Sequence, residues 1–273
     1  MNASPQVLGL IAGSRSLPLM LAREVRRMGV PRIVAVGFEG ETDPALAEWV
    51  DTLAWVKVGQ LTRMIRVLQD HGVTQCVMAG QIAPRSLFDV RPDLRALGLL
   101  LKLKEKNAHT IFGAVADELS KEGIELIEAT PWLQALMPGP GFHLGPNLTA
   151  EQREDVDFGY RMAGEISRLD IGQLVVVKQG VVLAVEGFEG TDACLARGGD
   201  LGGKAGGAVA VKVAKENHDM RWDIPCFGPG TLRTCARHRI VVLAVQSGKT
   251  LLLDADEVKQ LARKHGIAVI TAG

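Results

Sequence analysis

This chain of 273 residues lacks several features, and each absence excludes a class of protein. The 31 basic and 31 acidic residues cancel, so there is no overall positive field to hold a nucleic acid. The four cysteines form no Cys-x-x-Cys pair, which indicates reduced thiols and argues against a zinc site. No apolar run approaches the roughly 20 residues that span a bilayer, and no signal peptide is recognisable, so we expect a cytoplasmic protein.

Two nucleotide-binding motifs are also absent. The sequence contains neither the Gly-x-Gly-x-x-Gly fingerprint of dinucleotide-binding folds nor the glycine-rich P-loop that ends in Gly-Lys-Ser or Gly-Lys-Thr. The interpretation as a nicotinamide-dependent oxidoreductase therefore depends on the expected fold of the first half alone, because the dinucleotide-binding fingerprint is absent.

The first half of the chain alternates apolar strands with amphipathic helices. Strands are expected at residues 7–12, 32–37, 55–58, 75–79 and 124–127. Strands joined by helices of this length predict an α/β fold with a parallel, Rossmann-like sheet. The Pro- and Gly-rich residues 137–146 cannot sustain either regular element. We therefore predict an N-terminal α/β domain over 1–137, a linker over 138–148 and a C-terminal domain over 149–273.

The second half has a different pattern. A helix over residues 149–169 is followed by two expected hairpins, 174–185 and 240–253, and then by a helix near 256–264 and a strand at 267–270. The glycine-rich residues 198–207 are interpreted as a mobile loop. Hairpins combined with helices predict a mixed α/β domain.

Two glycine turns follow strands of the first half. Gly13 and Ser14 follow the first strand, and Gly80 and Gln81 follow the strand at 75–79. In open sheets, ligands bind beyond the carboxyl ends of the strands, and a helix N-terminus can hold a phosphate. The pattern fits a ligand contact, and it fits a plain structural turn equally well.

An acidic turn stands out in the second half. Glu186, Glu189 and Asp192 are spaced three residues apart, after an apolar strand and among glycines. Magnesium commonly takes one or two carboxylates, so a metal or substrate role is one interpretation. A solvated acidic turn is the other, with Thr191 or Asp192 capping a short helix.

The run from Arg221 to Pro225 is the second candidate. Asp223 could bind a metal or orient an attacking water, and Arg221 could clamp a phosphate through two parallel hydrogen bonds. An Arg–Asp surface pair explains the same residues without a function.

A leucine-rich stretch at 97–101 is followed by Lys102, Lys104 and Lys106. This pattern fits a helix that lines an acyl-chain pocket or rests on anionic lipid. It also fits a buried helix whose lysines reach out to solvent.

Several of these runs together resemble the LpxI-type UDP-2,3-diacylglucosamine pyrophosphatases. The matching runs are 169–173, 185–192 and 221–229, with 17–18, 58–61 and 77–82 in the first domain. The resemblance covers nearly the whole chain. It implies a magnesium-dependent hydrolase of lipid A synthesis, which splits a lipid-carrying UDP-sugar into UMP and a diacylated glucosamine 1-phosphate. It also implies that Asp223 is essential.

With the resemblance in view, we form a hypothesis for the candidate residues. Asp223, with Glu186, Glu189 or Asp192, would hold Mg²⁺, and Arg221 and Lys212 would stabilise charge on the departing phosphate. The remaining substrate-binding candidates are Gly13, Ser14, Gly80, Gln81, Gln173 and Thr191. Apolar side chains near the linker would take the acyl chains. A transient contact with the inner membrane is implied, and both a monomer and a homo-oligomer remain open.

The chain departs from the family pattern at three places. Gln81 stands where the family usually has lysine, residues 107–109 replace an acidic Gly-Asp-Asp, and residues 217–219 replace Gly-Gln-Asp. These changes leave an alternative, in which the protein binds a lipid or a sugar nucleotide on the same fold without catalysis.

Overall fold

The computed structural model describes residues 5–82, 92–104, 108–214, 220–221 and 224–273. These residues fall into two compact units. The first holds the described residues up to Leu133 together with Met220 and Arg221. The second holds those from Gln134 to Ala214 and from Ile224 to Gly273.

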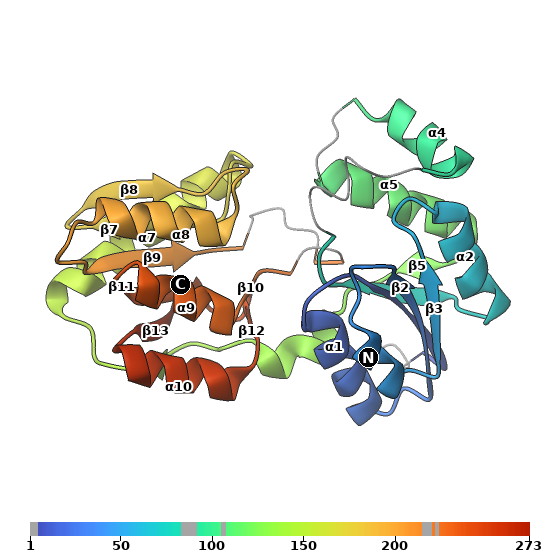
Figure 1. Ribbon diagram of the computed structural model, residues 1–273, viewed down its shortest axis with the longest axis horizontal. Helices are drawn as coiled ribbons and strands as arrows, with labels where there is room; N and C mark the ends of the chain where they lie inside the picture. The colour runs from blue at the N-terminus through green and yellow to red at the C-terminus, as the bar shows by residue number, and fades with distance from the viewer. Residues whose placement is uncertain (1–4, 83–91, 105–107, 215–219, 222–223) are drawn as a thin grey trace. The chain divides into compact units, whose positions relative to one another are not determined.

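The first unit contains a parallel sheet (Figure 1). In sheet order its strands are β3 (Thr52–Val56), β2 (Arg32–Phe38), β1 (Val7–Ala12), β4 (Gln75–Ala79) and β5 (Glu125–Leu126). The chain builds outward from β1 to β2 and β3, and then returns to β4 on the other side of β1. This reversal between β1 and β4 is a topological switch point, where ligands of open α/β sheets bind.

Helices pack on both faces of this sheet. The helical elements of the unit are α1 (Leu17–Arg27), η1 (Pro44–Glu48), α2 (Leu61–Asp70), α4 (Leu94–Lys102), α5 (Ala108–Lys121) and α6 (Thr130–Leu133). Leu61, Met64, Ile65 and Leu68 recur at helical spacing and bury one side of α2 against the sheet. Ala116 and Leu119 of α5 join the same core.

The second unit has a mixed sheet. Its strands, in sheet order, are β6 (His143–Leu144), β13 (Ala268–Ala272), β11 (Ile240–Gln246), β9 (Ala208–Lys212), β7 (Leu174–Lys178) and β8 (Val181–Val185). β13, β11 and β9 run parallel, whereas β7 is antiparallel to β9 and β8. A separate short pair joins β10 (Cys226–Phe227) to β12 (Leu251–Leu252).

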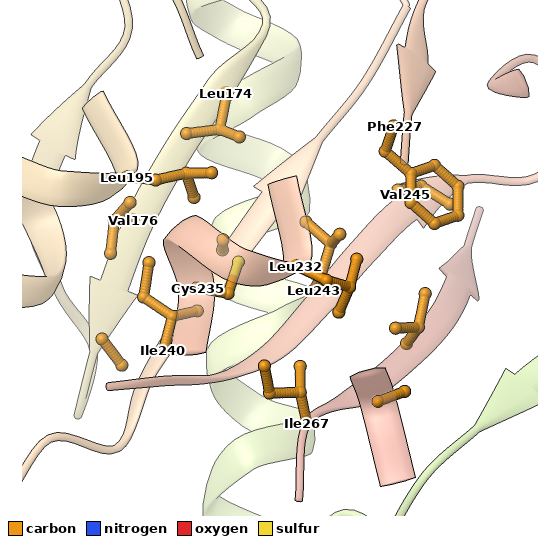
Figure 2. Packing of buried hydrophobic residues seen from close by; sticks show 14 of the residues in the cluster. Leu174, Val176, Leu195, Phe227, Leu232, Cys235, Ile240, Leu243, Val245 and Ile267 are labelled. Carbon is orange, nitrogen blue, oxygen red and sulfur yellow. The ribbon is translucent and has the colours of Figure 1, made fainter. Parts of the chain in front are cut away.

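Alternation along the strands divides the second core into two layers. Val175 and Val177 face the long helix α7, whereas Leu174 and Val176 face the opposite helices. Figure 2 shows the second layer, where Leu195, Leu232 and Ile267 meet residues of the sheet. The helical elements are η2 (Gln134–Leu136), α7 (Ala150–Arg168), α8 (Thr191–Leu201), α9 (Pro229–Arg237) and α10 (Ala255–His265).

The predicted fold class is confirmed. A parallel sheet with helices forms the first unit, and a mixed α/β arrangement forms the second. The predicted hairpin at 174–185 is present as β7 and β8. The predicted helix at 149–169 is present as α7, which starts at a reciprocal cap between Thr149 and Gln152.

The predicted second hairpin, 240–253, is wrong. β11 pairs with β9 on one side and β13 on the other, both parallel, so neither edge of β11 is open to a hairpin partner. Its almost continuous burial is typical of a central parallel strand. Residues 251–252 pair with β10 instead.

Two further local predictions are wrong in part. The glycine-rich stretch 198–207 begins inside α8, because Gly198 and Gly199 permit close packing. A Cβ on Gly198 would lie 2.5 Å from Val176, and one on Gly199 would lie 2.3 Å from the carbonyl oxygen of His238. Residues 143–144, expected to be irregular, form β6 at the edge of the second sheet.

Candidate functional site

The first-unit turns meet at the switch point. The Gly13 amide donates to the Ala79 carbonyl at 2.8 Å, and the Ser14 amide donates to the Gln81 carbonyl at 2.7 Å. The Ser14 hydroxyl also donates to the Gln81 carbonyl, at 2.8 Å. The four candidate residues of this edge, including Gly80, are therefore brought together, and two of their amides are used within the protein.

Packing explains both glycines. A Cβ on Gly13 would lie 2.5 Å from the Gln81 carbonyl oxygen, and one on Gly80 would lie 2.6 Å from that of Ser14. Gly80 also has φ of +90°, a conformation that residues with a Cβ rarely adopt. The structural-turn interpretation thus accounts for both glycines. The ligand-contact interpretation stays a prediction.

An apolar cavity of about 190 Å³ lies beside this edge, within the first unit. Its walls come from the ends of β1 and β4, from Leu61 and Met64 of α2, and from the facing sides of α4 and α5. From α4 and α5 it is lined by Ala96, Leu99, Leu100, Ile111, Phe112 and Val115. Apolar cavities of roughly 150 Å³ bind small hydrocarbons, so this one has room for a segment of acyl chain.

The leucine-rich helix lies over this cavity. It is not the buried helix of the second interpretation, because Leu94 and Leu101 are 89% and 74% exposed. The sequence also predicts that apolar side chains near the linker take the acyl chains, and this stays a prediction. The cavity described here lies within the first unit.

In the second unit, a chain of hydrogen bonds joins four of the candidate residues. Glu186 accepts from the backbone amide of Gln173 at 3.2 Å and from the Thr191 hydroxyl at 2.7 Å. Lys212 Nζ donates to Thr191 Oγ1 at 3.2 Å and to the Cys226 carbonyl at 3.1 Å. These groups gather at the carboxyl end of β9, close to the N-terminus of α8.

Lys212 is the most informative group of this chain of contacts. Its side chain is buried, and no ion pair joins it to a carboxylate among the described residues. Among the described residues its ammonium contacts two neutral oxygens, and the Glu186 carboxylate lies one hydrogen bond further, on the other side of Thr191. Gln173 Oε1 is also buried and has no partner in the described part of the chain. The edge is therefore suited to an anionic ligand that also offers a donor.

The other two acidic candidates are placed differently. Glu189 accepts from Arg197 at 2.6 Å and from the Gly187 amide at 3.0 Å. The Arg197 guanidinium lowers the pKa of the Glu189 carboxyl, which therefore remains ionised. Asp192 is exposed in the first turn of α8.

The acidic turn does not gather three metal-binding side chains at one point. Within the ranges that the structure describes, no group of three His, Cys, Asp or Glu side chains is arranged to hold an ion. Both oxygens of Glu186 and of Glu189 already accept hydrogen bonds from the protein. The assignment of these residues and Asp192 as ligands stays a prediction.

The predicted catalytic pair is only partly described. Arg221 is half-buried and groups with the first unit. Asp223 lies outside the described residues, as do residues 217–219. Their predicted roles are therefore not tested by the geometry.

Cysteine chemistry is excluded at three positions. Burial raises the pKa of Cys76, Cys194 and Cys235 to about 12, so these thiols stay protonated near neutral pH. They are packing residues, as the sequence indicated.

Sequence reasoning missed two groups of residues. The cavity walls from α5 follow an apolar pattern at Ile111, Phe112 and Val115, which a helical-period search could have found. The contact between Lys212 and Thr191 joins residues 21 positions apart, and no local sequence pattern predicts it.

The fold and these two edges define a class of protein. It is a two-unit α/β protein, with an apolar cavity at the switch point of the first unit and a buried lysine at a strand end of the second. Across the described ranges, no helix combines the length and apolar composition that crossing a bilayer requires.

Comparison with known proteins identifies the family. Residues 7–136 match the LpxI N-terminal domain, and residues 140–270 match the LpxI C-terminal domain. The chain is 34% identical over 274 aligned positions to the UDP-2,3-diacylglucosamine pyrophosphatase LpxI of Caulobacter vibrioides, covering 96% of each chain. The chain therefore belongs to the LpxI family.

Proposed function

We propose that this protein hydrolyses the pyrophosphate bond of UDP-2,3-diacylglucosamine in lipid A biosynthesis. The products are UMP and 2,3-diacylglucosamine 1-phosphate. The observation that carries the proposal is the 34% identity to a relative named for this activity, over 96% of both chains. Fold alone does not transfer a substrate, but this similarity includes both domains.

The apolar cavity supports the lipid part of the proposal. Hydrocarbon placed against Leu99, Leu100 and Phe112 leaves water, which contributes roughly 0.8 kcal/mol for each buried methylene. Gly13, Ser14, Gly80 and Gln81 adjoin this cavity or its edge and would contact the nucleotide or the sugar.

The buried lysine edge supports the phosphate part. In the reaction, water oxygen bonds to one phosphorus while the bond from that phosphorus to the bridging oxygen breaks. Negative charge then grows on the departing phosphate, and Lys212 and Arg221 would stabilise it. Thr191 would hold the Lys212 ammonium in place, and Gln173 Oε1, which has no partner among the described residues, would accept from a substrate donor.

Asp223 is the proposed residue that orients the attacking water. Mg²⁺ is the proposed cofactor, and it would supply charge neutralisation and a more acidic bound water. Among the described residues, Glu186, Glu189 and Asp192 are not arranged as a group of three ligands for the ion. The steps above are therefore assigned to the residues of the chain alone.

The direct test is UMP release from UDP-2,3-diacylglucosamine dispersed in detergent, with Mg²⁺ and with EDTA. We expect release that EDTA abolishes, and a loss of at least about a hundredfold in Asp223→Asn, which keeps the shape and removes the charge. Asp256→Asn, an exposed position in the first turn of α10, is the matched control and should keep wild-type activity.

Two results would reject parts of this proposal. Substrate binding by calorimetry without any UMP release would reject hydrolysis and favour a binding protein. Full activity of Asp223→Asn would remove this residue from the mechanism. A transient contact with the inner membrane is part of the proposal, because the substrate carries two acyl chains.

A further inference from the structure

Helix α4 is apolar on two opposite faces. Its inner side places Ala96, Leu99 and Leu100 on the cavity. Leu94 and Leu101 lie seven residues apart on the outer side, where they are 89% and 74% exposed. Leu97, also exposed, belongs to the same stripe, since positions i, i+3 and i+7 share one face of a helix.

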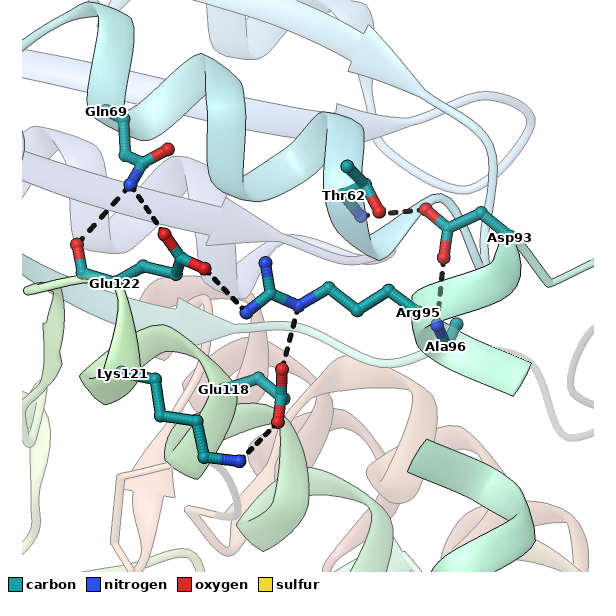
Figure 3. A network of polar contacts seen from close by, with 8 residues as sticks. All are labelled: Thr62, Gln69, Asp93, Arg95, Ala96, Glu118, Lys121 and Glu122. Atoms are coloured by element: carbon teal, nitrogen blue, oxygen red, sulfur yellow. Dashed lines mark hydrogen bonds and ion pairs between the residues drawn. The ribbon is translucent and has the colours of Figure 1, made fainter. Parts of the chain in front are cut away.

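Polar contacts fix which face of α4 points outward. Arg95 contacts Glu118 at 2.7 Å and Glu122 at 2.8 Å, both on or just after α5 (Figure 3). At the start of α4, Asp93 accepts from the backbone amides of Thr62 and Ala96, each at 2.8 Å. Because α4 is held to both α2 and α5, it cannot roll to bury its outer leucines without breaking these contacts.

Within the described residues, the one carboxylate next to the outer leucines is that of Asp93, and backbone amides of Thr62 and Ala96 already contact it. The sequence of α4 contains no Asp or Glu, and Lys102 and Lys104 are exposed at its C-terminal end. The acidic neighbours Glu118 and Glu122 are paired with Arg95, and Lys121 also pairs with Glu118. An exposed leucine stripe with lysines at its end complements an anionic lipid surface.

We infer that the outer face of α4, formed by Leu94, Leu97 and Leu101, docks on an anionic membrane surface, with Lys102 and Lys104 at the C-terminal end of the helix contacting the lipid head groups. The inference deepens the proposed function, since it assigns the membrane contact of a lipid-using enzyme to one helix. The same helix lines the cavity with its inner face, so docking places the lipid surface against the wall of the cavity.

Vesicle flotation with the full chain tests the inference without substrate. Wild type should bind vesicles of phosphatidylglycerol and phosphatidylethanolamine, and bind phosphatidylcholine vesicles weakly. Leu94→Ser with Leu101→Ser should lower the partition coefficient about tenfold or more, because two exposed leucines no longer enter the interface. Lys102→Glu with Lys104→Glu should abolish the preference for anionic lipid.

Matched control variants test whether the loss of any exposed leucine, or any equal change of charge, has the same effect on vesicle binding. Leu201→Ser changes an exposed leucine of α8 in the second unit, and Lys259→Glu with Lys264→Glu makes the same charge change on α10. Both should bind vesicles like wild type. Circular dichroism and melting curves check that each variant folds, which is expected because every changed side chain is exposed.

Three results would overturn the inference. These are equal binding of wild type to neutral and anionic vesicles, full binding by the serine variant, and a serine variant that alters self-association in sedimentation velocity while vesicle binding is absent. The last would make the outer face an interface between copies. UMP release from detergent-dispersed substrate is measured separately, so a failed inference is distinguished from a failed proposed function.

Discussion

In both units the candidate residues lie at the carboxyl ends of parallel strands, but the side chains at these ends differ in kind. In the first unit the turns at Gly13 and Gly80 are joined by backbone hydrogen bonds, and apolar side chains surround the adjoining cavity. In the second unit the edge carries Glu186, Thr191 and Lys212 in a chain of side-chain contacts. One edge is therefore suited to hydrocarbon and the other to an anion.

We therefore expect the two units to contribute differently to the binding and the turnover of an amphiphilic substrate. Apolar contacts contribute affinity in proportion to buried area, with little dependence on the reacting state. Charged contacts gain strength as charge develops in the transition state. Changes in the first unit should therefore alter KM, and changes in the second unit should alter kcat.

The largest expected effect comes from removing the buried charge of the second unit. Lys212→Met keeps the length of the side chain and deletes the ammonium, so kcat should fall about a hundredfold. Because a buried charge is costly to remove from water, replacing the ammonium by a methionine should leave stability unchanged or raise it. Steady-state UMP release and urea unfolding measure the two effects.

Lys178→Met is the control for this prediction. Lys178 lies at the other end of the same sheet, since β7 runs antiparallel to β9, and its Nζ donates to the Gly202 carbonyl. It should keep wild-type kcat. An unchanged kcat in Lys212→Met would remove the proposed difference between the units.

The next effect concerns the backbone edge of the first unit. Gly80→Ala should lower the free energy of unfolding by about 2–4 kcal/mol, because φ is +90° and the new Cβ would lie 2.6 Å from the Ser14 carbonyl oxygen. Gly40→Ala has a similar φ of +79° but open space around the Cβ, so it should cost only about 1 kcal/mol. Urea denaturation compares the pair. Equal losses would show that close packing at Gly80 has no separate cost.

The same contrast explains what the sequence could predict. The first sheet follows from local patterns, since apolar strands and amphipathic helices alternate and parallel strands need such crossovers. The second sheet depends on which strands pair over long distances. β11 and residues 251–253 form a convincing local hairpin pattern, yet β9 and β13 outcompete it for both edges of β11.

The candidate site shows the same limit. Glycine turns after Ala12 and Ala79 were predictable, because two neighbouring parallel strands end there. The burial of Lys212 was not, since it depends on Thr191 and Cys226 arriving from other elements. The outward leucines of α4 were ambiguous for a physical reason. When a helix has leucines on most sides, its sequence pattern does not indicate which side is buried against the rest of the protein.

A smaller effect is expected from filling the cavity of the first unit. Ala96→Phe places a ring in the space lined by Leu99 and Phe112, so KM for long-chain substrate should rise about fourfold for each methylene excluded. KM for a short-chain substrate, and kcat for both, should stay unchanged. Leu97→Phe, on the outer face of the same helix, is the control. A fall in kcat with unchanged KM would contradict the division between the units.

The smallest effect tests the ion pairs that hold α4. The Lys121 ammonium and then the Arg95 guanidinium lower the pKa of the Glu118 carboxyl, and Arg95 lowers that of Glu122. A carboxyl whose pKa is lowered by folding stabilises the protein above its ordinary pKa of about 4, and the contribution is lost as the pH falls further. Arg95→Met should therefore lower the melting temperature at pH 7 by no more than about two degrees.

This deficit should shrink as the pH falls through the carboxyl range, because protonation removes from wild type the same interaction that the substitution removes at pH 7. Melting curves of both proteins across this range measure the change. Arg63→Met, an exposed position on α2, makes the same charge change and should show no such convergence. If the deficit of Arg95→Met stays constant as the carboxyls protonate, Arg95 stabilises α4 through packing of its methylene groups instead.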